Sequence, residues 1–116
     1  MRLESETRDG VSILRLKGRF VTGSDAALVS ARKSLEEAGI DKTILDLGAV
    51  PYIDSTGLAF VVELHKSLAV RGGQLFLANA NERVREILEI TRISEVVPLF
   101  QDVEDAEAAL RGEVLC

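Results

Sequence analysis

The chain has 116 residues, of which 47% are hydrophobic and 28% charged, and its net charge is −5. This size and composition predict one globular domain over residues 1–116, and the negative charge disfavours nucleic acid as a partner. The single cysteine, Cys116, excludes an intrachain disulfide, and the single histidine, His65, excludes a multi-histidine metal site. We therefore expect neither a metal nor a cofactor.

The apolar stretches of the chain are too short to cross a membrane. The longest run, residues 58–62, falls far below the roughly 20 residues that a transmembrane helix needs. Residues 1–6 contain no apolar core of a secretion signal. We expect a cytoplasmic protein with no direct insertion into a membrane.

The first part of the chain predicts a β-hairpin, a helix and a buried strand. Residues 11–16 are rich in branched apolar side chains, and Asp9-Gly10 predicts a tight turn that connects them to an earlier strand over residues 3–7. From Ser24 onward, apolar residues recur at helical spacing until Gly39 ends the helix. Residues 43–47 then predict a short buried strand.

The second part continues the alternation of helix and strand. A long helix is predicted over residues 55–71, followed by a strand over residues 74–78. Asn81 is expected to cap a third helix, residues 97–100 to form a short strand, and Asp102 to open a last helix. The order β-β-α-β-α-β-α-β-α predicts an α/β fold, with a mixed, mainly parallel sheet and an antiparallel N-terminal edge strand.

The helix over residues 55–71 has an apolar stripe and two large apolar side chains beside it. The stripe that is expected to face the core consists of Leu58, Val61, Val62, His65, Leu68 and Ala69. Phe60 and Leu64 fall on the flank or outer side of this helix. They either pack against a neighbouring helix or form an exposed apolar anchor for a partner. The two interpretations can coexist, with Leu64 packed and Phe60 exposed.

The segment Asp54-Ser55-Thr56-Gly57-Leu58 lies where a strand and loop pass into this helix. Ser55 is a good N-cap residue, and Asp54 suits the positive end of the helix dipole, so a purely structural interpretation is available. The same geometry exposes the Ser55 hydroxyl. A phosphate there would meet free backbone amides without disturbing the fold, and it would repel a partner that packs flat on this corner.

This segment and its surroundings resemble the STAS domain (sulphate transporter and anti-sigma-factor antagonist), as found in the anti-sigma-factor antagonists of bacteria. The Asp-Ser-Thr-Gly-Leu run is similar to the phosphorylation motif of that family, and Ser55 corresponds to its phosphoserine. The resemblance covers nearly the whole chain, through Ile13-Leu14-Arg15-Leu16-Lys17-Gly18, Ile44-Leu45-Asp46-Leu47, Gly72-Gly73-Gln74-Leu75, Val84 to Thr91 and Ala106 to Leu110.

The resemblance implies a STAS-like fold and a partner-switching role in transcription regulation, as in stress responses. In this family the unphosphorylated protein binds a serine-kinase anti-sigma factor and so frees a sigma factor. The kinase uses ATP to phosphorylate the serine, and a metal-dependent phosphatase of the PP2C type restores the binding form. Ser55 would then be a phosphorylated substrate residue, and the protein would not be an enzyme.

One loop departs from the pattern of the family. Family members commonly have an acidic residue in a Gly-Glu-Leu-Asp run, whereas this chain has Gly18-Arg19-Phe20-Val21-Thr22-Gly23, with Val21 at the acidic position. This loop follows a strand end and is expected near Ser55. The predicted partner-binding residues are Phe20, Val21, Thr22, Asp54, Ser55, Thr56, Gly57 and Phe60.

Two other functions were compared with this one. A STAS accessory subunit of another assembly, such as an ATP-driven lipid transporter or a stress-signalling complex, would keep the fold without the kinase, and the altered Val21 loop favours considering it. A serine hydrolase would need a base beside Ser55. His65 lies ten residues further along the helix, and the chain contains no Gly-x-Ser-x-Gly motif. We therefore predict no catalytic residues.

Overall fold

A mixed five-stranded sheet forms the centre of the molecule. The computed structural model describes residues 2–18 and 25–110. The strands are β1 (Arg2–Arg8), β2 (Val11–Lys17), β3 (Lys42–Ala49), β4 (Gln74–Ala78) and β5 (Leu99–Phe100), in the spatial order β1-β2-β3-β4-β5. β1 pairs antiparallel with β2, and every other pair is parallel. The predicted fold class is confirmed.

The hairpin of β1 and β2 forms because Asp9 and Gly10 adopt the turn that their sequence predicts. Both have positive φ angles, 52° and 80°, as a two-residue turn of the primed type requires. The turn sets the register, with Arg8 opposite Val11 and Leu3 opposite Leu16. Every second residue of β1 therefore faces the same side of the sheet as Leu14 and Leu16.

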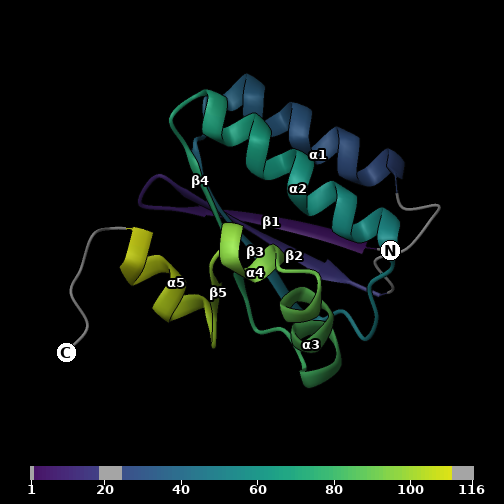
Figure 1. The fold of residues 1–116 in the computed structure, drawn as a ribbon. Helices are drawn as coiled ribbons and strands as arrows, with labels where there is room; N and C mark the ends of the chain where they lie inside the picture. Colours follow the sequence, from purple (N-terminus) through teal and green to yellow (C-terminus); the bar gives the residue numbers. More distant parts are fainter. Residues whose placement is uncertain (1, 19–24, 111–116) are drawn as a thin grey trace.

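The helices cover the two faces of the sheet unequally. They are α1 (Asp25–Ala38), α2 (Ser55–Val70), α3 (Glu82–Ile90), α4 (Ile93–Val96) and α5 (Val103–Leu110). In Figure 1, α1 and α2 lie side by side over one face, and α5 lies against the other. The sequence did not predict α4, a single turn that begins after Arg92 reverses the chain with a φ of 64°.

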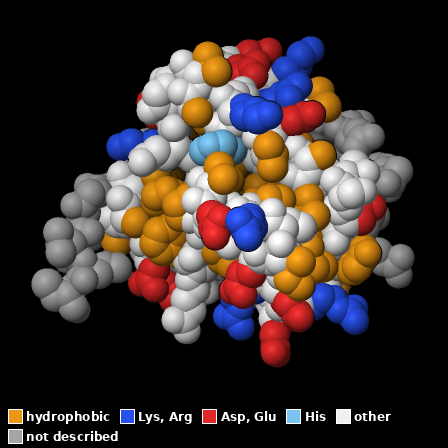
Figure 2. All heavy atoms as spheres, in the orientation of Figure 1, with side chains coloured by type: hydrophobic (Ala, Val, Ile, Leu, Met, Phe, Trp, Pro, Cys, Tyr) orange, Lys and Arg blue, Asp and Glu red, His pale blue; other side chains and the backbone are white. Residues whose placement is uncertain are grey.

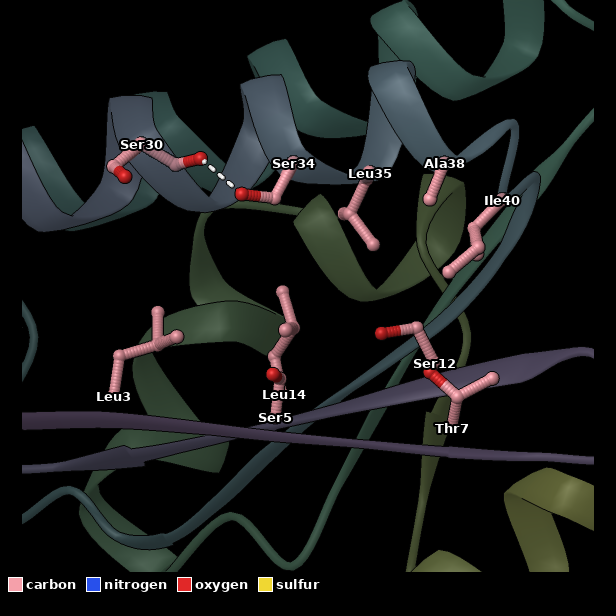
Figure 3. Close-up of a pocket in the computed structure, with 10 residues that line it drawn as sticks. All are labelled: Leu3, Ser5, Thr7, Ser12, Leu14, Ser30, Ser34, Leu35, Ala38 and Ile40. Carbon is pink, nitrogen blue, oxygen red and sulfur yellow. Dashed lines mark hydrogen bonds between the residues drawn. The ribbon is translucent and has the colours of Figure 1, made fainter.

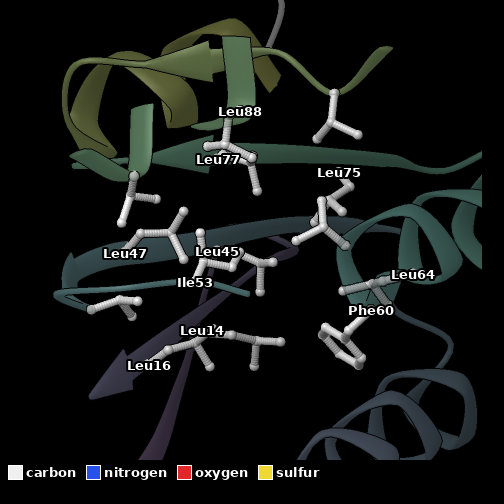
Figure 4. Packing of buried hydrophobic residues seen from close by; sticks show 14 of the residues in the cluster. Leu14, Leu16, Leu45, Leu47, Ile53, Phe60, Leu64, Leu75, Leu77 and Leu88 are labelled. Atoms are coloured by element: carbon white, nitrogen blue, oxygen red, sulfur yellow. The ribbon is translucent and has the colours of Figure 1, made fainter. Parts of the chain in front are cut away.

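Two hydrophobic clusters hold these layers together. The larger one fills the space between the sheet and α2 and α3, and Figure 4 shows its leucines from β2, β3 and β4 meeting those of the helices. The smaller one joins Ile13, Ile44 and Phe76 to α5. Because β2 and β3 contribute alternate residues to each cluster, both strands are buried on both sides.

Charged side chains occupy the part of the second face beside β1. Glu6 on β1 accepts a hydrogen bond of 2.8 Å from Arg15 on β2, and Arg8 pairs with Glu107 of α5 at 3.0 Å. The hydrogen bond from Arg15 lowers the pKa of Glu6 below its ordinary value. These pairs tie the edge strand to its neighbours from the side opposite α1.

The buried face of α2 differs from the predicted stripe. Phe60 and Leu64 are buried, with exposed fractions of 8% and 1%, whereas Ala69 is exposed and His65 is half-buried. The reason is the position of α1, which covers the flank of α2 where Phe60 and Leu64 lie. Within residues 2–18 and 25–110, none of the helices combines the length and apolar character needed to cross a bilayer.

Candidate functional site

The predicted motif lies at the edge of the sheet where the parallel strands end. β2, β3, β4 and β5 all run toward this edge, so the loops that follow them gather there. The amide of Gly18, just after β2, donates to the carbonyl of Ala49, the last residue of β3, at 3.0 Å. The chain then passes through residues 50–54 and enters α2 at Ser55.

Asp54, rather than Ser55, is the N-cap of α2. Its Oδ1 accepts hydrogen bonds from the amides of Thr56, at 2.9 Å, and Gly57, at 3.1 Å. The expectation that Ser55 is the cap is therefore wrong: Asp54 has the extended backbone of a cap residue, with φ −110° and ψ −172°, and its carboxylate is the stronger acceptor. Ser55 is the first helical residue and is exposed, Thr56 is half-buried, and Gly57 is buried.

This cap changes the electrostatics expected for a phosphate on Ser55. The amides of Thr56 and Gly57, which were expected to be free for the phosphate, are bonded to the Asp54 carboxylate. A phosphate on Ser55 would therefore stand beside a negative charge that already occupies the positive end of the helix. The helix start disfavours a second anion as long as Asp54 keeps this position.

The loop ahead of the motif is held from both sides. Val50 and Ile53 are buried, each 1% exposed, while Tyr52 between them projects outward and is 42% exposed. Asn81 caps α3 by accepting from the amide of Val84 at 2.8 Å, and its Nδ2 donates to the carbonyl of Val50 at 3.2 Å. The sequence predicted only the cap, because the second bond joins residues 31 positions apart.

A polar cluster centred on Asp46 connects the ends of neighbouring strands at the edge of the sheet where the motif lies. Asp46 near the end of β3 accepts from the amide of Gly48 at 2.9 Å and from Nδ2 of Asn79 at 3.1 Å, and its other oxygen lies 3.5 Å from Nε of Arg15. Asn79 has a φ of 64°, a conformation that asparagine tolerates better than most residues. The bonds align the ends of β3 and β4, and sequence reasoning did not identify them.

The loop with Phe20, Val21 and Thr22 lies outside the described residues, but its two ends are placed. Gly18 lies against Ala49, as described above. After the loop, α1 is fixed to α2 near the C-terminal ends of both helices. Ser67 of α2 donates a hydrogen bond to Glu36 of α1 at 3.2 Å, and Arg71 donates to the carbonyl of Ile40. Both bonds join residues 31 positions apart in the sequence. The two helices therefore run parallel, and this offset in the sequence relates the residues that face each other.

Phe60 does not belong to the exposed part of this edge. Its side chain points from α2 into the larger hydrophobic cluster, next to Leu64, as Figure 4 shows. The interpretation of Phe60 as an exposed anchor is wrong, and the packing interpretation is confirmed for both residues. Within the described ranges, the exposed aromatic side chain near Ser55 is Tyr52.

The metal-ligating groups and the charges on the surface that the structure describes indicate what kind of partner it suits. No group of three or more histidine, cysteine, aspartate or glutamate side chains that could hold a metal occurs among the residues that the structure describes. On the face shown in Figure 2, acidic and basic side chains are interspersed, with hydrophobic side chains between them. Such a surface suits a protein partner better than a polyanion.

Comparison with known proteins gives consistent matches. The model of the STAS domain matches residues 2–106. The protein described as "putative anti-sigma factor antagonist BtrV" from Bordetella bronchiseptica is 32% identical over 112 residues, covering 96% of each chain. The crystal structure of an anti-sigma factor antagonist from Mycobacterium paratuberculosis superimposes with a TM-score of 0.86 at 24% identity, over 95% of this chain and 93% of that one. The phosphorylated form of the Bacillus cell fate determinant SpoIIAA gives a TM-score of 0.71 at 17% identity, over 97% and 100%.

Proposed function

Because this chain belongs to the STAS-domain family of bacterial anti-sigma-factor antagonists, we propose that it is a binding module whose partner is released by phosphorylation of Ser55. The observation that carries this proposal is the position of Ser55, exposed at the first residue of α2 and directly after the capping Asp54. A kinase can reach this hydroxyl without opening the core.

The physical basis of the switch is local charge. A phosphate adds about −1.5 to −2 charges at neutral pH, and here it would stand beside the Asp54 carboxylate. A partner packed on this edge would have to desolvate both anions, which is costly without a matching cation. The fold itself does not depend on the Ser55 side chain, because the contacts of α2 with the core come from Gly57, Val61, Leu64 and their neighbours.

The partner we propose is a serine-kinase anti-sigma factor, which binds the unphosphorylated form and uses ATP to modify it. A phosphatase of the PP2C type would reverse the reaction, and the chain itself would have no catalytic role. The contact surface would comprise Asp54 to Gly57, the exposed Tyr52, and the loop with Phe20, Val21 and Thr22. Because Val21 replaces an acidic residue, this loop would fit a less basic kinase surface than the usual one.

The proposal is tested by incubating the chain with its cognate kinase and ATP and by locating phosphate with mass spectrometry. Ser55→Ala should abolish labelling, while Thr56→Val, a matched change at the next hydroxyl, should keep it. Ser55→Asp should keep the circular dichroism spectrum and weaken partner binding by more than Ser55→Ala does. Labelling that persists in Ser55→Ala would overturn the assignment of the site. Equal, stable binding by all three proteins would favour the accessory-subunit alternative.

A further inference from the structure

A groove lies between α1 and the edge of the sheet, and Ser55 is not among the described residues that line it. It has a volume of about 440 Å³, with strands β1 and β2 as its floor and α1 as its roof. Figure 3 shows Leu3, Ser5 and Thr7 of β1 below, and Ser30, Ser34 and Ala38 of α1 above. Volumes of this size are typical of small-molecule sites in proteins.

The groove exists because α1 presents short side chains to the sheet. Ser30, Ser34 and Ala38 recur every four residues and so share one face of the helix. The hydroxyl of Ser34 donates to the carbonyl of Ser30 at 3.0 Å, which turns it along the helix instead of down to the strands. Among the α1 side chains that the structure describes, Leu35 is the large one that both lines the groove and is buried.

Hydroxyl side chains lie along and beside the floor. Thr7, Ser12 and Thr43 stand opposite one another on β1, β2 and β3, so three hydroxyl residues form a row across this face of the sheet. Within the described part of the chain, Ser12 is 2% exposed and its side chain lines the groove. The Thr43 hydroxyl is buried without a hydrogen-bond partner in that part of the chain. Buried hydroxyls normally have partners, because leaving one unpaired costs free energy.

The described lining is uncharged. It consists of serine and threonine hydroxyls together with aliphatic side chains such as Leu3, Leu14 and Ile40. The charged residues of β1, among them Glu6 and Arg8, form ion pairs on the opposite face. A charged ligand would therefore lose its hydration without gaining a counter-charge.

We propose that this groove binds an uncharged small molecule with an aliphatic body and a hydroxyl or carbonyl group, which bonds to Ser12. The aliphatic body replaces water against Leu3, Leu14 and Leu35. Access does not require unfolding, because Ser5 and Thr7 on one rim and Ser30 and Ser34 on the other are exposed. The proposal does not depend on the phosphorylation of Ser55.

The test uses three probes of equal chain length: 1-octanol, octanoate and octylammonium. Titration is followed by methyl NMR of the leucine and isoleucine residues of the groove, with contacts to the probe measured as intermolecular NOEs. We expect saturable chemical-shift changes with 1-octanol. Octanoate and octylammonium should each bind at least about tenfold more weakly than 1-octanol. Ser12→Ala should weaken the binding of 1-octanol about fivefold, because it removes one hydrogen bond.

Filling the groove provides a second, independent variant. Ser34→Leu places a large side chain in the roof from an exposed helical position and should abolish saturable binding. Ala69→Leu places a leucine at an exposed position of α2, outside the groove, and should leave binding unchanged. Equal binding of the alcohol and the charged probes, undiminished binding in Ser34→Leu, or shifts centred on the exposed Val70 and Ile90 would each overturn the proposal. So would the absence of any saturable shift, which would mean that the groove holds only water.

Discussion

The two long helices α1 and α2 lie parallel over the same face of the sheet, yet the side chains that the structure describes on them differ in burial. α2 buries Gly57, Phe60, Val61, Leu64 and Leu68 against the sheet and its neighbours. Of the α1 side chains that the structure describes, Leu35 alone is buried. Between the described residues of the two helices, the polar links are a hydrogen bond from Ser67 to Glu36 and a pair between Arg32 and Glu63 at 3.9 Å.

The difference separates two tasks within one layer. The rigid attachment of α2 sets the position of its first residue, Ser55, so a modifying enzyme and a partner meet a defined surface. The described part of α1 borders the groove above β1 and β2. Close packing of α2 therefore serves the proposed switch, and the groove beside α1 provides space for the proposed ligand.

The largest expected effect comes from truncating one core leucine on each helix. Leu64→Ala should lower the free energy of unfolding by about 3 to 4 kcal/mol, because the side chain is packed on all sides. Leu35→Ala should lower it by about 2 kcal/mol, since Leu35 already borders an open space and loses fewer contacts. Urea unfolding measures both values. Equal losses would show that α1 is packed as tightly as α2.

The next effect concerns the start of α2. Asp54→Ala should destabilise the protein by about 1 kcal/mol, because the amides of Thr56 and Gly57 lose their shared acceptor. Asp54→Asn keeps an acceptor oxygen in the same place and should cost well under half of that. Thermal unfolding of the two variants side by side makes the measurement. A loss for Asp54→Asn as large as that for Asp54→Ala would assign the stabilisation to charge instead of capping geometry.

A smaller effect is expected from the contact between the two helices. The pair of Arg32 and Glu63 is long and largely exposed, with 34% and 66% of the two side chains accessible. A double-mutant cycle with Arg32→Gln and Glu63→Gln should give a coupling energy of about 0.5 kcal/mol or less. A coupling energy several times larger would mean that this ion pair contributes substantially to the contact between α1 and α2, contrary to our expectation.

The smallest effect is expected from the ion pair of Glu6 and Arg15. This pair lies on the face of β1 and β2 that is opposite the groove. The pKa of Glu6 is lowered by the hydrogen bond from Arg15, so this pair stabilises the fold above the ordinary glutamate pKa and is lost as the pH falls through the lowered value. Arg15→Gln should return the pKa of Glu6 toward its ordinary value. NMR titration of the side-chain carboxyl carbon measures this shift, and an unchanged pKa in Arg15→Gln would contradict the stated cause.

Local signals predicted most of the fold. The Asp9-Gly10 turn, the strand over residues 74–78 and the Asn81 cap all formed as expected, because each depends on residues close together in the chain. The motif at Ser55 was also placed correctly at a helix start, since a strand, a loop and a helical period follow one another there. Asp54 and Ser55 were both suitable N-cap residues from their types, and only the extended backbone of Asp54 in the folded protein identifies it as the cap.

The sequence by itself determined the order of the elements, the mainly parallel sheet and the position of an exposed hydroxyl at the start of α2. The tertiary structure alone decided which flank of α2 is buried, how Asn81 ties α3 to the loop ahead of Ser55, and that α1 stands above a groove lined with hydroxyls. Periodicity shows that a helix has an apolar face, but the burial of Phe60 depends on where a second helix lies. That position results from contacts between residues far apart in the chain, which no local pattern records.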